Sequence, residues 1–447
     1  MRPRTPAEAL DLAKRAVALT RADEAEALVA VSEGALTRFA GNRIHQNVAQ
    51  SDAEVSVRAV LGKRVGVAST NRLDDASLAA CCDAAAAAAR VAPEDPGFPG
   101  LPAAGENAFA DRSADSVAGF GADSRARAAA GLIAQAAERG LTAAGKVEVS
   151  RGAIAVANSA GTAAAMAAGD LSANVLAMGD DGGSGWASFV SGEASDLSAE
   201  ALGARAADLA SRSADPGDLE PGAYAVVLAP DAVASLLEYL AYVGFSAKDV
   251  EEGSSFMSGR IGERLLSERV TIADDAAGAG ALGLAFDYEG VPKRRTVIVD
   301  AGVAAGPVTD SYWAARTGRP NTGHALPAPN RWGPQALDLV MDSGDSSIDE
   351  MIASVERGVY VTRFHYVNVE EPVRAVLTGM TRDGTFLIED GRLARPLKNQ
   401  RFTQSAVDAL TNVRAVGRTL TAVRADFGTF RVPAMTVDGF TLTGQTG

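Results

Sequence analysis

The feature that most constrains the fold of this chain is a repeated change in the spacing of its apolar residues. Residues 6–19 space them as one face of a helix, with a period near 3.6. In AEVSVRAV, Val55, Val57 and Ala59 instead alternate with polar residues, the pattern of a strand buried on one face. Helical and strand patterns follow one another along the chain, with glycine turns between strands. This combination predicts an α+β protein with antiparallel sheets.

The first half of the chain predicts helices beside an antiparallel meander. Thr5 to Glu8 form a capping box that begins a helix ending near Leu19. Residues 24–70 predict the meander. Its turns are expected at Gly34, Gly41-Asn42 and Gly62-Lys63. Further helices are predicted over 74–90, 121–138 and 198–212, with short strands over 146–192 that include a glycine-rich hairpin at 179–183.

Two segments rich in proline and glycine divide the chain. Residues 91–102 hold four prolines and two glycines, and ADPGDLEPG follows at 214–222. We therefore expect an N-terminal α/β domain over 1–220, with a sub-boundary near 91–118. A β-rich C-terminal domain is expected over 221–447.

The second half carries strong turn signals. Residues 295–302, RTVIVDAG, predict an apolar strand. Asp383-Gly384 and Asp390-Gly391 predict hairpin turns at the two ends of another strand, because both positions of such a turn need a positive φ.

Charge and cysteine content limit the classes of function. The chain has 447 residues, with 42 basic and 56 acidic side chains, giving a net charge of −14. A nucleic-acid surface needs clustered basic residues, so we expect no nucleic-acid partner. No apolar run is as long as a membrane span, and the N-terminus lacks the apolar core of a signal peptide. Adjacent Cys81 and Cys82 give no disulfide framework, which favours a cytoplasmic protein.

The segment PDAVASLLEYLAYVG, residues 230–244, predicts a helix with Asp231 as its N-cap. Its buried face is expected to carry Val233, Leu236, Leu237, Leu240 and Val243, and its other face Ser235, Glu238 and Tyr242. Glu238 is expected on the solvated side, and the alternative is a general base or a metal ligand. A catalytic zinc site needs three protein ligands, and nothing near Glu238 in the sequence supplies the other two.

Two histidines are candidate functional residues. His365 lies between Phe364 and Tyr366, where a packed or hydrogen-bonded histidine is expected rather than a metal ligand. His324 lies in a loop rich in proline, glycine and asparagine, where simple exposure is expected and a place in a cleft is the alternative.

Acidic and basic residues near predicted turns offer further candidates. Asp274-Asp275 with Asp287 and Glu289 suggest either a solvated turn or a site for a hard cation, and the turn is favoured. The predicted hairpin at Arg382-Asp383 projects an arginine that can hold a peptide carboxylate by a bidentate contact. The alternative for Asp383 is a purely structural role in the turn.

Several stretches spread over nearly the whole chain carry a family resemblance. They are TRFAGNRIHQNVAQSDAEVSVRAVLGKRVGVAST, SSFMSGRIGERLLSERVTIADD, FDYEGVPKRRTVIVDAG, VTRFHYVN and TGMTRDGTFLIEDGRLARPLKNQRFTQSAVDAL. Through them the chain resembles the TldD/TldE (PmbA) proteins, the modulator-of-gyrase family of metallopeptidases. In that family two related chains pair, and the TldD-type chain holds zinc through HExxxH and a late cysteine.

The resemblance also shows what this chain lacks. Counting back from Gly253, the window that matches HExxxH begins at Glu238 and ends at Val243, with Tyr239 at the place of the catalytic glutamate. No histidine lies between His45 and His324, and the C-terminal half has no cysteine.

The resemblance therefore implies a TldE-type subunit that is inactive alone and has no cofactor of its own. It implies a TldD-type partner that carries HExxxH and zinc, with small or unfolded peptides as substrates in peptide maturation or turnover. The candidates for a substrate channel or interface are Arg382, Asp383, His365, His324 and Glu238. The alternative is a stand-alone binding or regulatory protein, such as a modulator of gyrase or of a toxin–antitoxin system.

Overall fold

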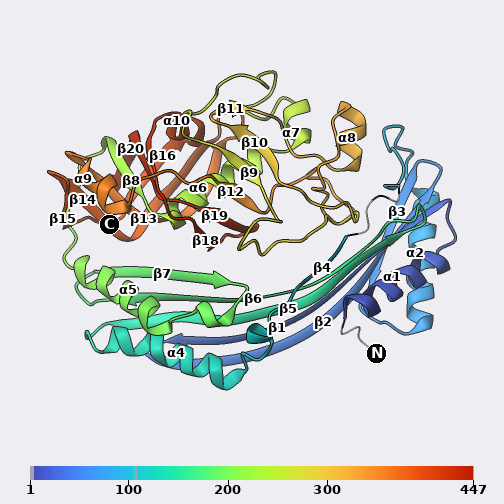
Figure 1. The fold of residues 1–447 in the computed structure, drawn as a ribbon, viewed down its shortest axis with the longest axis horizontal. Coiled ribbons are helices and arrows are strands. Elements are labelled where there is room, and N and C mark those ends of the chain that lie inside the picture. Colours follow the sequence, from blue (N-terminus) through green and yellow to red (C-terminus); the bar gives the residue numbers. More distant parts are fainter. Residues whose placement is uncertain (1–4, 104, 106–107, 446–447) are drawn as a thin grey trace.

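The computed structural model describes residues 5–103, 105 and 108–445. An N-terminal half is built on one large curved sheet, and a C-terminal half lies on the concave side of that sheet (Figure 1). Most neighbouring strands are antiparallel, and helices pack against the sheets. The predicted α+β class is confirmed. None of the helices in the described ranges is long and apolar enough to cross a membrane.

The N-terminal sheet has the strand order β3-β2-β1-β5-β6-β4, and β7 also pairs with β6. The bounds are β1 Glu24–Ala40, β2 Arg43–Leu61, β3 Arg64–Thr70, β4 Phe109–Arg112, β5 Thr142–Asn158, β6 Ala163–Met178 and β7 Ser184–Ser191. The meander predicted over 24–70 is confirmed as β1 to β3. The turn expected at Gly34 is wrong, because this glycine stays extended inside β1 and pairs with Gln50 and Ser150. The strands predicted as short are long, since β5 pairs along its length with both β1 and β6.

Helices cover the two ends of this sheet on its convex side (Figure 1). Their bounds are α1 Pro6–Leu19, α2 Asp75–Val91, α3 Asp115–Ala118, α4 Ala122–Ala137 and α5 Ala199–Arg212, with a 3-10 turn at Ala194–Asp196. Glycines allow two of them to lie almost on the strands. A Cβ on Gly66 would stand 2.2 Å from the backbone nitrogen of Ala89 in α2, and one on Gly185 would stand 2.1 Å from the carbonyl oxygen of Ala206 in α5. Any larger residue at Gly66 or Gly185 would push its helix off the sheet.

The C-terminal half contains two sheets. One has the order β11-β10-β9-β12-β19-β18. In the other, β13, β8, β20, β16 and β14 close into a ring, because β13 also pairs with β14. The strand bounds are β8 Gly222–Leu228, β9 Ile272–Asp274, β10 Thr296–Asp300, β11 Val303–Ala304, β12 Leu339–Met341, β13 Arg357–Glu371, β14 Val376–Glu389, β15 Arg392–Pro396, β16 Gln400–Ser405, β17 Val413–Val416, β18 Thr421–Arg424, β19 Thr429–Val432 and β20 Met435–Gln445.

Short helices and one longer helix complete this half. The bounds are α6 Pro230–Gly244, α7 Ala247–Glu251, α8 Ser311–Thr317, α9 Ile348–Ala353 and α10 Ala406–Thr411. The apolar face of α6 is fully buried in the main core, through Leu236, Leu237 and Leu240. The opposite face of α6 contacts β7 of the N-terminal sheet through Asp231 and the β18–β19 hairpin through Glu238.

The two Asp-Gly pairs behave differently. Asp390-Gly391 forms the predicted turn, between β14 and β15, with φ of 48° and 71°. The turn predicted at Asp383-Gly384 is wrong: both residues lie inside β14, where the register with β13 shifts. Their φ values, 55° and 117°, are positive as the sequence suggested. A β-bulge also uses such residues, which explains the error.

Candidate functional site

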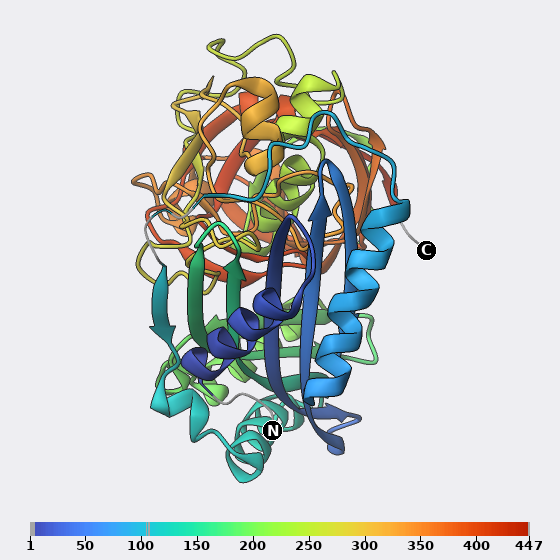
Figure 2. The same ribbon diagram turned by 90° about the vertical axis from the view of Figure 1, so that its right-hand side faces the viewer.

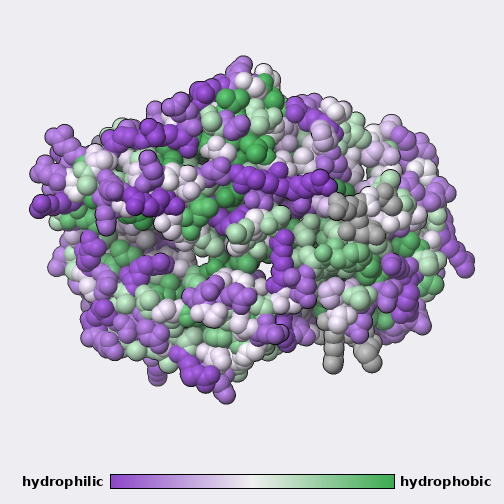
Figure 3. All heavy atoms as spheres, viewed as in Figure 1, coloured by the Kyte–Doolittle hydropathy of each residue, from purple (hydrophilic) through white to green (hydrophobic). Residues whose placement is uncertain are grey.

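A cavity of about 580 Å³ lies between the two halves of the molecule. Four elements line it: β7 of the N-terminal sheet, and α6, β13 and the β18–β19 hairpin of the C-terminal half. Hollows are visible along the boundary between the two halves in the space-filling view (Figure 3). We call this cavity the α6 groove. It brings two of the sequence candidates together, Glu238 and His365.

Glu238 is the most unusual residue of the α6 groove. It is buried, with 6% of its surface exposed, so its predicted place on the solvated side of the helix is wrong. The backbone N–H of Phe427 donates to its Oε1 at 2.7 Å, and the ring of Phe427 stacks on Tyr242 of α6. Burial raises the pKa of Glu238 to about 7, and the carboxylate of Asp426 adds to the rise. Glu238 is buried because the tip of the β18–β19 hairpin covers this face of α6.

Asp231 joins the two halves at the start of α6. Trp186 Nε1 and Ser188 Oγ of β7 donate to its Oδ1, at 3.3 and 2.8 Å. The helix is capped at Ala229 without a side-chain bond, so the predicted N-cap role of Asp231 is wrong. Its carboxylate is directed to β7 instead, and this holds one wall of the α6 groove against the other.

Arg363 and Asp383 form a second fixed element in the groove wall. Arg363 Nε donates to Asp383 Oδ2 at 2.8 Å, and the guanidinium lies 4.2 Å from the ring centroid of Trp186. Asp383 is buried, and the side chain of Arg382 beside it is 40% exposed. The predicted hairpin that would project both residues does not exist. Asp383 therefore positions Arg363, which lines the groove.

His365 and Tyr366 lie where β13 bulges away from β14. Their rings meet edge to face, and both line the α6 groove. Burial, aided by the nearby Arg382 and Arg363, lowers the pKa of His365. Tyr366 has a φ of 56° and is 76% exposed. A bulky residue rarely adopts this conformation, and such strain clusters at ligand-binding sites. No local pattern in the sequence indicates this conformation.

His324 lies outside the α6 groove. It is only 1% exposed, so the expected exposure is wrong. Its Nε2 lies 3.1 Å from Asp274 Oδ1, and its Nδ1 lies 2.9 Å from Thr322 Oγ1. Lys293 Nζ lies 2.8 Å from Asp338 Oδ2 and 3.7 Å from Asp274 Oδ1. We call Asp274, Lys293, His324 and Asp338 the ionic core.

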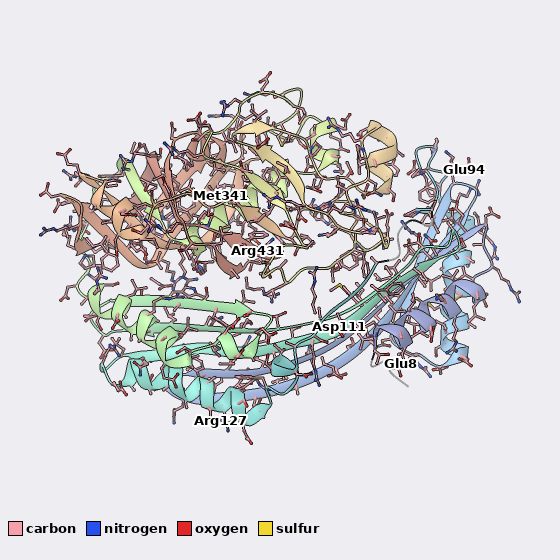
Figure 4. All side chains as sticks on the ribbon, in the orientation of Figure 1. Glu8, Glu94, Asp111, Arg127, Met341 and Arg431 are labelled. Atoms are coloured by element: carbon pink, nitrogen blue, oxygen red, sulfur yellow. The ribbon has the colours of Figure 1, made fainter. Side chains whose placement is uncertain are left out.

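The acidic residues predicted as one solvated turn are buried. Asp275 pairs with Arg295 and with Arg431, a β19 residue labelled in Figure 4. Asp287 accepts from the backbone N–H groups of Glu289, Val291 and Ala325. Each carboxyl therefore has its own structural partners.

The residues of the α6 groove do not fit a zinc ion. Catalytic zinc takes three protein ligands from histidine, cysteine, aspartate or glutamate. In the part of the chain that the structure describes, no three such residues converge on a point where they could hold a metal. Of the window that resembles HExxxH, Glu238 and Tyr239 line the groove, and Val243 is buried in the core. Glu238 is also turned toward a backbone N–H rather than toward a second carboxylate or imidazole.

The fold and the groove define a class: a two-part α+β protein with a groove between its parts and no metal-binding set within the described residues. Residues 221–444 match the family model of the PmbA/TldA metallopeptidase C-terminal domain, and residues 25–89 match that of PmbA/TldA metallopeptidase domain 1. The chain belongs to the PmbA/TldD family.

Relatives of known sequence or structure agree with this assignment. A metalloprotease of Methanothermobacter thermautotrophicus is 28% identical over 200 residues, which are 44% of this chain and 43% of that protein. A TldD homologue of Haemophilus influenzae is 28% identical over 203 residues, covering 44% and 41%. The matched region thus spans less than half the length of these relatives.

Solved structures match over nearly the whole chain. TldE from Thermococcus kodakarensis superposes with a TM-score of 0.86 at 21% identity, covering 97% of this chain and 99% of that one. A Thermotoga maritima protein described as a proposed modulator of a DNA gyrase gives 0.85 at 19% identity, covering 97% and 99%. At these identities the likeness establishes the fold.

Proposed function

We propose that this chain is the non-catalytic, TldE-like subunit of a heterodimeric zinc metallopeptidase that cleaves small or unfolded peptides in the cytoplasm, in peptide maturation or turnover. A TldD-type partner carrying HExxxH would hold the zinc, and this chain would bind and align the peptide beside it. The family assignment and the full-length likeness to TldE support the proposal.

The observation that carries the proposal is the composition of the groove face of α6. That face bears Ser235, Glu238, Tyr239 and Tyr242, with no histidine. A metallopeptidase needs a metal-bound water and a general base within reach of the same carbonyl group. Glu238 alone offers at most the base, so this chain needs a second chain for hydrolysis.

The edge of a sheet beside the groove supports peptide binding. Among the described strands, β18 pairs with β19 only, so its other edge is open in the sense that no strand is paired with it, and β7 lies near it. The Ala425 N–H donates to the Gly428 carbonyl at the hairpin tip. In an antiparallel pair the hydrogen-bonding direction alternates, so Ala422 and Arg424 direct their backbone groups to the open edge. An extended peptide can add there as a further strand, independently of its sequence.

Co-expression with an HExxxH-bearing homologue tests the proposal. Each chain and the mixture are examined for mass by light scattering, for bound zinc and for cleavage of an unfolded peptide. We expect a one-to-one complex with zinc and cleavage, and neither in this chain alone. The matched control replaces the first histidine of the partner's HExxxH motif by alanine, which should abolish cleavage without dissociating the complex.

Two outcomes would contradict the proposal. Stoichiometric zinc and chelator-sensitive cleavage by this chain alone would make it an enzyme in its own right. A stable homodimer that ignores every HExxxH homologue would favour a stand-alone regulatory protein.

A further inference from the structure

A second cavity, of about 640 Å³, lies at the other end of the boundary between the two halves. Strand β3, helix α2 and residues 95–100 form one wall, and α7, α8 and the loop over 325–333 form the other. Figure 2 shows the segment after α2 crossing from the N-terminal sheet over the C-terminal half. Tyr312 OH contacts Asp95 Oδ1 across the junction at 3.4 Å. We call this space the junction cavity, and its volume is in the range of small-ligand sites.

The inner wall of the junction cavity carries more buried carboxyl groups than cations. Arg58 Nη2 lies 2.8 Å from Glu26 Oε2, and Arg58 Nη1 lies 3.2 Å from Glu289 Oε1. Asp310 is 6% exposed, lines the cavity, and accepts from the N–H of Trp313 through Oδ1 at 2.8 Å. Within the described ranges, Asp310 has no ion-pair partner. The guanidinium of Arg58 thus stands among three buried carboxyls, of which Glu289 and Asp310 line the cavity and Glu26 lies behind Arg58.

The buried charges therefore lack a cation. Burial raises the pKa of Glu26 to about 7 and that of Asp310 to about 6, and in both cases the nearby Glu289 adds to the rise. Arg58 Nε, buried at the same wall, has no hydrogen-bond acceptor among the described residues, so a carbonyl or carboxylate oxygen of a ligand could fill that place. A ligand that brings an ammonium group would supply the missing charge, because buried carboxylates are stable only when paired.

The rest of the lining adds two cations, one further carboxylate and aromatic surface. Lys248, Arg331 and Asp95 line the cavity; Lys248 pairs with Glu252, and Arg331 forms no ion pair with any described residue. Phe98, Tyr312 and Trp313 supply aromatic surface. A polyamine would meet these cations at its second amine. A ligand with an ammonium group at one end and a carboxylate at the other fits both ends.

We propose that the junction cavity binds a short peptide by its free N-terminal ammonium group, which pairs with Asp310 and Glu289, while the carboxyl end lies toward Arg331. The choice of a peptide as the ligand rests on the proposed function. The arrangement of charges in the cavity is independent of that function. The junction cavity and the α6 groove are then two separate peptide sites on one chain. A divalent cation is a poorer fit, because the described carboxyls do not converge as a metal-binding group.

Calorimetric titration of the full-length chain tests this proposal. The ligands are the tripeptide Ala-Ala-Phe, its N-acetylated form and putrescine. We expect the free tripeptide to bind and N-acetylation to weaken binding by about tenfold or more, the value of one charge-assisted hydrogen bond. Asp310→Asn should cause a similar loss for the free tripeptide. Asparagine is as good an N-cap as aspartate, so α8 should stay folded.

Matched variants separate this proposal from the function of the α6 groove. Asp74→Asn makes the same change at the N-cap of α2, away from the cavity, and should leave tripeptide binding unchanged. Glu238→Gln changes the α6 groove only. Loss of tripeptide binding in Glu238→Gln, with Asp310→Asn unaffected, would overturn the junction site while leaving the proposed function intact. Equal binding of the acetylated peptide or of putrescine, or no binding of the tripeptide at all, would also overturn it.

Discussion

The ionic core and the α6 groove both bury carboxyl groups in the C-terminal half, but they balance the charge in opposite ways. In the ionic core, Lys293 and His324 stand beside Asp274 and Asp338. Burial opposes the charge of Asp274, yet Lys293 and His324 outweigh burial and hold its pKa below the usual range, whereas burial raises the pKa of Asp338 in the same cluster. In the groove, burial raises the pKa of Glu238 to about 7.

The difference lies in which cations are free. Two arginines line the α6 groove, but Arg424 pairs with Asp170 and Arg363 pairs with Asp383. Among the described residues, Glu238 is therefore left with backbone N–H groups as its donors. Removing one partner of a paired buried cluster destabilises the fold, whereas an uncompensated carboxyl beside a cavity has capacity left for a ligand or a proton. The comparison predicts large stability effects in the ionic core and smaller, pH-dependent effects in the groove.

Lys293→Met should have the largest effect on stability. It removes the cation between Asp274 and Asp338 and leaves both carboxyls buried without it, which typically costs about 3–5 kcal/mol. The measurement is the free energy of unfolding in urea at pH 7. The control is Lys146→Met, which breaks the partly exposed pair with Glu148 and should cost below about 1 kcal/mol. Equal losses of unfolding free energy in the two variants would mean that Lys293 contributes no more to stability than an exposed ion pair does.

Glu238→Gln should change the pH dependence of stability. The pKa of Glu238 is about 7 in the folded chain against an ordinary 4.5, so folding favours the protonated form. Its contribution is complete below about pH 4.5 and is lost as the pH rises through 7. Glutamine keeps the acceptor for the Phe427 N–H and does not titrate. From pH 5 to 8 the variant should therefore gain about 2 kcal/mol relative to the unmodified chain.

The quantity compared is the difference in unfolding free energy between the variant and the unmodified chain at each pH. This comparison is needed because other buried carboxyls also titrate. Glu26 and Asp287, each with a pKa of about 7, remain in both proteins and cancel. A difference that stays constant from pH 5 to 8 would show that Glu238 is ionised in the groove throughout.

Asp383→Asn tests whether the groove wall depends on a charge. Asparagine tolerates the positive φ at this position, so the loss should come from the pair with Arg363. We expect a decrease in unfolding free energy of roughly 1–2 kcal/mol. Asp390→Asn is the matched control, since Asp390 also precedes a glycine at positive φ but lies in an exposed turn. If Asp390→Asn costs as much, backbone strain rather than the ion pair explains both losses.

The same residues show how far the sequence could predict the site. The absence of histidines from α6 could be read from the sequence, because all residues of the HExxxH motif lie within one helix. The burial of Glu238 was not, because the N–H that covers it belongs to Phe427, 189 residues later. The Asp-Gly pairs correctly predicted positive φ. Whether each made a turn or a bulge depended on strand pairing with β13, which a local pattern does not contain.

The burial of His324 also depends on a residue far away in the sequence. The loop composition around His324 suggested exposure, and a distant aspartate, Asp274, made burial possible. The elements themselves were predictable, since α1, α2 and the 24–70 meander follow caps, periodicity and turn glycines within each segment.

Tyr366→Gly should have the smallest effect on stability and the most informative sign. The left-handed backbone at Tyr366 costs a non-glycine residue about 1–2 kcal/mol, and glycine adopts it freely. Glycine also loses about 0.5–1 kcal/mol more entropy on folding. The side chain is largely exposed, so little packing is lost. We expect a net gain of about 0.5 kcal/mol in urea unfolding, together with weaker peptide binding at the α6 groove.

Val373→Gly is the control for the last prediction, because Val373 is also exposed but is not at a positive φ. It should destabilise the chain by about 0.5–1 kcal/mol through entropy alone. The strain at Tyr366 serves a ligand if Tyr366→Gly gains unfolding free energy while Val373→Gly loses it, and if only Tyr366→Gly binds peptide more weakly. If Tyr366→Gly gains unfolding free energy but binds peptide as before, the strain is a by-product of the bulge. The ionic core and the α6 groove would then differ only in how their buried charges are paired.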